Sequence, residues 1–200
     1  VIIITTKKGS TDRMKVSFTT TNSIQTRTKL NDMLSREEFI NVVNTQGSDA
    51  QKALLGNTYT DWNDEIYHNA FGTDNNLSLS GRLAKNFPIR VSIGYYNQDG
   101  LVKTDNAERI TGSVSLSPSF FDDHLKLNFN VKGSRNDNRF ANSNAIWNAA
   151  TWNPTIPVYS GNDTFGGYTE ATDNVGQLVT GGTVNPLGAL KQYKSTSRVS

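Results

Sequence analysis

The chain lacks cysteine entirely and is poor in apolar residues for its length. Without cysteine, these 200 residues can form no disulfide, no thiolate metal site and no thiol nucleophile. Only 35% of the residues are hydrophobic, which is little for a soluble core, yet the 19% of charged residues is not the profile of a disordered chain. The net charge of +2 is close to balanced and indicates neither nucleic acid nor an anionic surface as a partner.

Long apolar runs are also missing. No stretch approaches the ~20 apolar residues that a membrane helix needs. Residues 1–4 are apolar but have no basic region before them and no small-residue cleavage site after them, so they are not a signal peptide. They predict a strand without its upstream partner, and residues 197–200 stop inside a β-like pattern. We therefore expect the chain to be a fragment.

What the chain does have is alternation of apolar and polar residues with a period of two. In residues 125–133, for example, Leu127 and Phe129 oppose Lys126 and Asn128. Side chains of a strand alternate between its two faces, so each such stretch has one apolar and one polar face. The stretches are close to the ~9–11 residues with which a tilted strand crosses a bilayer. Strands are predicted near residues 15–26, 75–84, 89–99, 109–118, 125–135 and 194–200.

The connections alternate between short and long. Residues 85–88 and 120–124 form short turns, whereas 28–73 and 134–190 are very long and 99–108 is intermediate. Short turns at one rim and long loops at the other are typical of outer-membrane barrels, and soluble sandwiches rarely contain loops of this length. The sequence thus predicts an all-β fold, a portion of an antiparallel transmembrane β-barrel with long outer loops.

In such a barrel the apolar faces contact lipid and the polar faces line the lumen. The residues predicted to face lipid are Leu77, Leu79, Val91, Ile93, Val114, Leu116, Leu127 and Phe129. The residues predicted to face the lumen are Arg82, Arg90, Arg109, Lys126 and Lys132.

The long loops contain signals for short helices. Residues 35–38 form a capping box, in which the Ser35 and Glu38 side chains bond each other's backbone N–H groups. Asp61 is expected to cap a helix over 62–71, and Asn142 or Ser143 a helix over 145–152. Ordered loops of this length more often bind something than serve as slack connections.

Several strings, in order along the chain, resemble the SusC/RagA-like TonB-dependent transporters. Residues 1–9 resemble the closing strand of the family's plug domain. Residues 60–66, 75–81 and 92–100 resemble its first barrel strands and first outer loop, and residues 153–159 and 185–187 resemble its third outer loop. The resemblance spans nearly the whole chain.

The resemblance implies a domain division and partners. Residues 1–9 would be the last plug strand, and 10–200 the first part of a barrel of about twenty-two strands with outer loops 27–74, 100–108 and 136–193. Family members lie in the outer membrane of Gram-negative bacteria, pair with a SusD-like surface lipoprotein and import oligosaccharides or peptides with energy from TonB. The TonB box and most of the plug are absent from these residues.

Groups that could carry chemistry have simpler interpretations. His68 and His124 are interpreted as solvated histidines, and Asp61, Asp64 and Glu65 as helix-capping acids, not catalytic carboxylates. The acidic pairs at 122–123 and 162–163 lack the spacing of a calcium loop and suit turns. We therefore expect no enzyme activity, no catalytic residue, no metal and no cofactor.

The loop aromatics with their polar neighbours are the candidate substrate site. Aromatic rings with amide and carboxylate neighbours bind sugars or peptides by stacking and hydrogen bonding. The alternative is that these rings pack the loops against each other and against the lipoprotein. The candidate residues are Trp62, Asp64, Tyr67, Trp147, Trp152, Asn153 and Tyr159.

Two other functions remain open. A soluble carbohydrate-binding β-domain would need a second sheet over the apolar strand faces. A structural outer-membrane barrel without active import would share the strand pattern but not the energy coupling.

Overall fold

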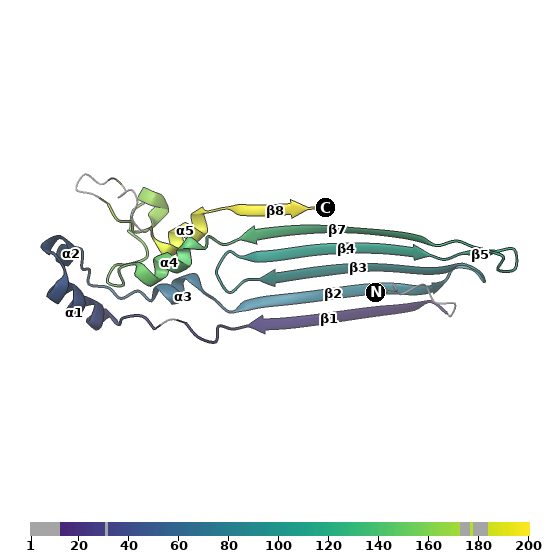
Figure 1. The fold of residues 1–200 in the computed structure, drawn as a ribbon, viewed down its shortest axis with the longest axis horizontal. Coiled ribbons are helices and arrows are strands. Elements are labelled where there is room, and N and C mark those ends of the chain that lie inside the picture. Colours follow the sequence, from purple (N-terminus) through teal and green to yellow (C-terminus); the bar gives the residue numbers. More distant parts are fainter. Residues whose placement is uncertain (1–12, 31, 173–176, 178–183) are drawn as a thin grey trace, which may run out of the picture.

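A six-stranded antiparallel sheet dominates the structure (Figure 1). The computed structural model describes residues 13–30, 32–172, 177 and 184–200, so the predicted plug strand lies outside the described residues. Neighbouring strands follow the order β1-β2-β3-β4-β7-β8. Their bounds are β1 Lys15–Gln25, β2 Ala70–Arg82, β3 Pro88–Asp99, β4 Asn106–Leu116, β7 Phe129–Phe140 and β8 Ser195–Val199.

The helices gather at one end of this sheet, and a small hairpin projects from the other (Figure 1). None of the described helices is both long and apolar enough to cross a membrane. The bounds are α1 Arg36–Gln46, α2 Asp49–Ala53, α3 Trp62–Ile66, α4 Asn144–Thr151, η1 Thr164–Gly167 and α5 Pro186–Gln192. The hairpin consists of β5 Ser119–Phe120 and β6 Leu125–Lys126. The long connections therefore share one end, as the sequence predicts.

The cross-strand register sorts the side chains onto two different faces. Val16, Leu79, Val91, Val114 and Val131 form one row across five strands. The row on either side of it is also apolar or glycine, and we call this side of the sheet the apolar face. The opposite side, the polar face, carries serines in the row Ser17, Ser78, Ser92 and Ser113.

The apolar face is exposed in the described structure. Ile93 is 57% exposed, Phe129 54% and Val131 70%. Among the described residues no second large sheet covers this face, because the only other sheet is the two-stranded hairpin β5–β6. The apolar residues therefore do not meet in a closed interior, as a soluble sandwich would require.

Several strands reach further toward the helical end than the apolar alternation indicated. β2 begins at Ala70, β4 begins at Asn106, and β7 continues to Phe140. Apart from Ala70, Phe71 and Phe140 at their ends, these extensions are mainly polar on both faces; Asn97, Glu108 and Asp137, for instance, lie in register on the side of the apolar face. A strand that is polar on both faces shows no period-two hydrophobic signal, which is why the predicted bounds were too short.

The predicted strand over 125–135 is interrupted at its start. Leu125 and Lys126 pair with β5, and the ladder between β4 and β7 resumes at Phe129 in the same register. Pro118, opposite the gap, accepts a hydrogen bond from the Leu127 N–H at 3.0 Å but has no N–H to return. Leu127 and Lys126 therefore lie outside the six-stranded sheet, contrary to prediction.

The helix predicted over 62–71 is shorter than expected. α3 ends at Ile66, because Tyr67 already forms an isolated bridge with Val102 and β2 starts at Ala70. The predicted capping box of α1 is confirmed: Ser35 and Glu38 bond each other's backbone N–H groups. At α4, Ser143 makes no capping bond, while Asn142 Oδ1 accepts from the Asn144 N–H at 3.1 Å.

Candidate functional site

The buried core of the described structure lies in the loops and not on the sheet. It forms in what we call the loop cluster: helices α3, α4 and α5 with the residues that cap them, among them Trp152 and Asn185, together with residues 54–60 and 153–160. Its buried members are Trp62, Ile66, Ala145, Ala149, Trp152 and Leu190. The loop cluster therefore has a hydrophobic core of its own at the end of the sheet.

Helix α3 begins the cluster and owes its position to Asp61. The Asp61 carboxylate accepts from the backbone N–H groups of Asn63 at 2.9 Å and Asp64 at 3.2 Å. The four-residue spacing then points Trp62 and Ile66 to the same, buried side. The capping interpretation thus agrees with the geometry for Asp61.

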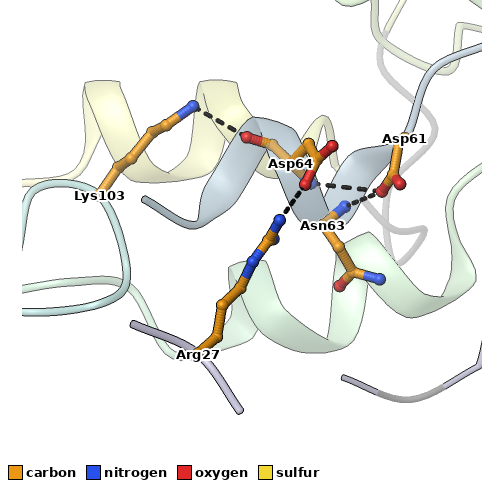
Figure 2. A network of polar contacts seen from close by, with 5 residues as sticks. All are labelled: Arg27, Asp61, Asn63, Asp64 and Lys103. Carbon is orange, nitrogen blue, oxygen red and sulfur yellow. Dashed lines mark hydrogen bonds and ion pairs between the residues drawn. The ribbon is translucent and has the colours of Figure 1, made fainter. Parts of the chain in front are cut away.

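Asp64 joins three separate parts of the chain (Figure 2). Its carboxylate forms an ion pair with Arg27, which follows β1, and its backbone carbonyl accepts from Lys103 Nζ at 3.1 Å. Lys103 belongs to the turn between β3 and β4. Exposed ion pairs contribute only about 0.2–1 kcal/mol, so this network orients α3 more than it stabilises the fold.

The two buried tryptophans form the centre of the core. Their rings meet edge to face, with centroids 6.3 Å apart and planes at 85°. Trp62 is 3% exposed and Trp152 is 6% exposed. Both rings are thus engaged chiefly with protein.

Asn153 and Thr155 tie the first long loop to the third. The Asn153 carbonyl accepts from Trp62 Nε1 at 3.0 Å, and its amide Nδ2 donates to the Leu54 carbonyl at 2.9 Å. The fully buried Thr155 hydroxyl donates to Asn153 Oδ1 at 2.7 Å and accepts from the Gly56 N–H at 2.8 Å. These bonds join residues almost one hundred positions apart and satisfy buried backbone groups.

Asn185 likewise joins segments of the third long loop through side-chain hydrogen bonds. It is fully buried, and its Oδ1 caps α5 by accepting from the Gly188 N–H at 3.0 Å. Its Nδ2 donates to the carbonyls of Val158 at 2.9 Å and Thr169 at 3.0 Å. The Glu170 carboxylate accepts from the Asn185 N–H at 2.9 Å, and partial burial raises the pKa of Glu170 above its ordinary value.

A cleft of about 260 Å³ opens between the loop cluster and α1. Its walls are mainly apolar and aromatic, with threonines and acids at its margin. They include Phe39, Tyr59, Trp62, Ala150, Thr151 and Trp152. Tyr59 is 59% exposed, so the cleft is open to a ligand or partner at this side.

The structure separates the predicted substrate residues into two groups. Trp62, Trp152 and Asn153 hold the loop cluster together, and Tyr67 is half-buried against it. Trp147 on α4 is 69% exposed, and Tyr159 is 59% exposed with its ring 5.4 Å from that of Tyr168. A substrate role remains a prediction for all of them, but only the exposed rings offer a free face for stacking.

Both histidines make hydrogen bonds to backbone carbonyls. His68 is half-buried, with Nε2 at 2.8 Å from the Gly100 carbonyl, so it is not the solvated side chain that was expected. His124 is exposed in the hairpin turn, with Nδ1 at 2.6 Å from the Phe121 carbonyl. The His68 contact helps to position the turn that follows β3, and the His124 contact the turn between β5 and β6.

The residues that sequence reasoning missed are Thr60, Thr155, Glu170 and Asn185. Small polar residues in loops usually face water, and only tertiary contacts make them buried partners of distant backbone groups. The Asn-Pro pair at 185–186 is a signal for a helix start, which points to the cap of α5 but not to its other bonds.

Relatives and solved structures resemble this chain over most of its length. It is 44% identical over 173 residues to the TonB-dependent receptor SusC of Bacteroides thetaiotaomicron, covering 84% of this chain and 17% of that protein. It is 27% identical over 179 residues to a TonB-dependent receptor of Formosa agariphila, covering 82% of this chain and 17% of that protein. No family model matches the chain.

The structural comparison gives the same fold. The RagAB peptide transporter matches 92% of this chain and 25% of its own chain, with a TM-score of 0.55 and 20% identity. The RagAB peptide importer in its open-open state matches 92% and 24%, with a TM-score of 0.57 and 22% identity. The antiparallel sheet with its long loops at one end is thus the arrangement found in these transporters.

These findings define the class of the chain as TonB-dependent receptors. Within this class the chain belongs to the SusC-like family, and the predicted resemblance is confirmed. It spans only 17% of the length of the curated relatives it matches. The relatives are named as receptors and transporters and not as enzymes.

Proposed function

We propose that this chain forms part of the wall and outer loops of a TonB-dependent transporter that imports glycans or peptides together with a SusD-like lipoprotein. The observation that carries the proposal is the division of one sheet into an exposed apolar face and a polar face. Apolar side chains exposed over several rows need lipid or protein to cover them, and here the rows through Val91, Ile93 and Leu116 all place their apolar residues on the same side of the sheet.

The apolar face would contact lipid. Leu77, Leu79, Val91, Ile93, Val114, Leu116 and Phe129 all lie on it, and Leu127 lies at the interruption opposite Pro118. Tyr95 ends the apolar rows toward the loops, where an aromatic side chain suits the boundary between lipid and water.

The polar face would line the lumen. Arg90, Arg109 and Lys132 lie on it among serines and threonines, and Arg82 follows at the end of β2. Lys126 is in the hairpin β5–β6, at the rim. The guanidinium of Arg109 stacks over the ring of Tyr96, 5.1 Å from its centroid. Closing such a wall into a barrel of about twenty-two strands would remove the open edges at β1 and β8.

The loop cluster would present the substrate side of the transporter. Its own core holds Trp147, Tyr159 and the cleft beside Tyr59 in place, so the exposed rings do not depend on a ligand for their positions. RagAB is named as a peptide transporter, which supports a peptide as one class of solute. The SusD-like lipoprotein and TonB follow from membership in the family.

Cysteine labelling tests the orientation of the sheet. These 200 residues contain no cysteine, so a single cysteine can be introduced at either of two adjacent positions of the full-length protein. Val91→Cys lies on the apolar face and Ser92→Cys on the polar face. In membranes, Ser92→Cys should react with a water-soluble maleimide and Val91→Cys only with a membrane-permeant one. Equal labelling of both by the water-soluble reagent would contradict a lipid-facing apolar side.

Uptake assays test import. Trp147→Ala and Tyr159→Ala should weaken solute capture in whole cells without changing the amount of protein in the outer membrane, and loss of TonB should abolish uptake. Uptake that continues unchanged without TonB would favour a structural barrel. Recovery of the full-length protein in the soluble fraction without detergent would favour the soluble binding domain.

A further inference from the structure

Three arginines lie on the same side of the sheet as the apolar face, at its end toward the loops. Arg135 shares the last apolar row with Ile110 and Tyr95, and the other two lie beyond that row. Arg135 and Arg139 are on β7, four and eight residues after Val131 of the central apolar row, and side chains at even spacings share a face. Arg198 of β8 pairs in register with Asp137, which places it on that side as well. We call Arg135, Arg139 and Arg198 the arginine cluster.

The arginine cluster has three guanidinium groups, and among the described residues only one carboxylate, that of Asp137, forms ion pairs with them. Arg135 Nε donates to Asp137 Oδ2 at 2.8 Å, and Arg198 Nε donates to Asp137 Oδ1, so two guanidinium groups share one carboxylate. Arg139 forms no ion pair among the described residues. Each guanidinium has five N–H donors in a planar fork, so donors remain for an oxyanion.

Apart from Asp137, the acidic residues of the same rows lie on other strands. Glu108 is on β4, beside Asp137 in register, and Asp99 is on β3, two strands away from Arg139. Positive charge is therefore concentrated on β7 and β8. A hollow of about 510 Å³ lies there, and its walls include the two guanidinium groups of Arg139 and Arg198, the two carboxylates of Glu108 and Asp137, and Thr196.

The position of the arginine cluster next to the apolar face indicates which kind of ligand it can bind. A strand rises about 3.3 Å per residue, so Arg135 lies roughly 13 Å and Arg139 roughly 26 Å along β7 from Val131. If the apolar face contacts lipid, which is the proposed function, the next rows on the same side contact the head groups of the adjoining leaflet. Arginine binds phosphate oxygens in a bidentate, charge-assisted manner.

We propose that the arginine cluster binds the phosphate of a lipid head group on the outer surface of the sheet. The hollow beside Arg139 and Arg198 receives the phosphate, and Asp137 holds Arg135 and Arg198 in place for it. This inference rests on the proposed function, because it needs the apolar face to contact lipid.

Native mass spectrometry of the full-length protein in detergent tests the proposal, with a bisphosphorylated diglucosamine glycolipid (lipid A) as the probe. Arg135→Gln, Arg139→Gln and Arg198→Gln together should weaken its binding roughly tenfold or more, since charge-assisted hydrogen bonds are lost. The matched control changes Arg82, Arg90 and Arg109 to Gln, with the same loss of charge from the opposite face, and should leave binding unchanged. Arg139→Gln alone, which breaks no ion pair among the described residues, should weaken binding severalfold and serves if the triple variant does not fold.

Equal binding by the arginine-cluster variants and the unchanged protein would overturn the proposal, and so would an equal loss in the control. The unchanged protein should bind the dephosphorylated glycolipid as weakly as the triple variant binds the phosphorylated one. If the unchanged protein binds both glycolipids equally well, phosphate is not recognised. Inorganic phosphate that displaces the lipid at equal concentration would indicate a site for the free anion and overturn lipid binding. Cysteine labelling at Val91 and Ser92 reports separately on the proposed function, so the two failures are distinguishable.

Discussion

The sheet and the loop cluster differ in where they place their apolar side chains. The sheet is held by its backbone ladders and leaves its apolar side chains exposed, with Phe18 at 63% and Val131 at 70%. The loop cluster buries Trp62, Ile66 and Leu190 almost completely and satisfies its backbone with side chains such as Asn185. The sheet therefore leaves its apolar side chains for an apolar environment to cover, which is lipid in the proposed function, whereas the loop cluster buries its apolar side chains within its own core.

Because of this difference, the free-energy cost of a substitution should depend on different factors in the two regions. In the sheet, the environment of a face decides the cost of a change, and neighbouring residues on one strand should differ sharply. In the loop cluster, burial and hydrogen bonding decide the cost, whichever element a residue belongs to.

The largest effect is expected in the core of the loop cluster. Trp62→Ala removes a 3% exposed ring, its edge-to-face contact with Trp152 and its bond to Asn153, and should cost about 3–5 kcal/mol of local stability. Hydrogen exchange in the full-length protein should then show lost protection across α3 and α4, with the sheet unchanged. The exposed Trp147→Ala is the control and should leave protection intact; equal losses in both would remove the distinction between the two regions.

A charge on the apolar face should have the next largest effect. Val91→Lys is expected to cost about 2–4 kcal/mol of folding free energy in a bilayer, while the adjacent Ser92→Lys should be mild. Urea unfolding of the full-length protein in liposomes measures both. Leu79 and Leu116 offer the same comparison against Ser78 and Ser115, and similar tolerance on both faces would refute the assignment of the faces.

The polar connections of the loop cluster should matter somewhat less. Asn185→Ala removes the side-chain donor to the Thr169 and Val158 carbonyls and the acceptor of the Gly188 N–H, although the Val158 carbonyl still accepts from the Thr169 N–H, and it should cost about 1–3 kcal/mol. Asn185→Asp keeps the helix-capping oxygen but loses the amide donor, so it separates the two roles. Protection of α5 against hydrogen exchange should fall more in Asn185→Ala than in Asn185→Asp; the reverse order would argue against the cap.

The smallest effect concerns the pH dependence of α1. The hydrogen bonds from the backbone and hydroxyl of Ser35 lower the pKa of Glu38 below its ordinary value of 4.5. The capping stabilisation is therefore complete above that value and is lost as the pH falls through the lowered pKa. Hydrogen-exchange protection of α1, corrected for intrinsic rates, should decrease in this acid range, whereas Glu38→Gln, which retains an acceptor but cannot titrate, should show no such dependence.

Local sequence predicted the features that depend on neighbours along the chain. The period-two alternation identified the apolar halves of the strands, and the capping residues Ser35 and Asp61 marked the starts of α1 and α3. The polar extensions of β2, β4 and β7 escaped prediction because neither of their faces has an apolar pattern. The interruption was missed because Pro118 lies at the end of the strand predicted over 109–118 and not within residues 125–135, whose pairing it interrupts.

The sequence by itself determined which side of each strand is apolar, because alternation is a property of a single strand. Only the tertiary structure decided that these sides agree across five strands, that Asn153 and Asn185 join distant loop segments, and that Arg135, Arg139 and Arg198 share one surface. Register and long-range hydrogen bonds depend on which strands and loops meet, and no local spacing in the chain contains that information.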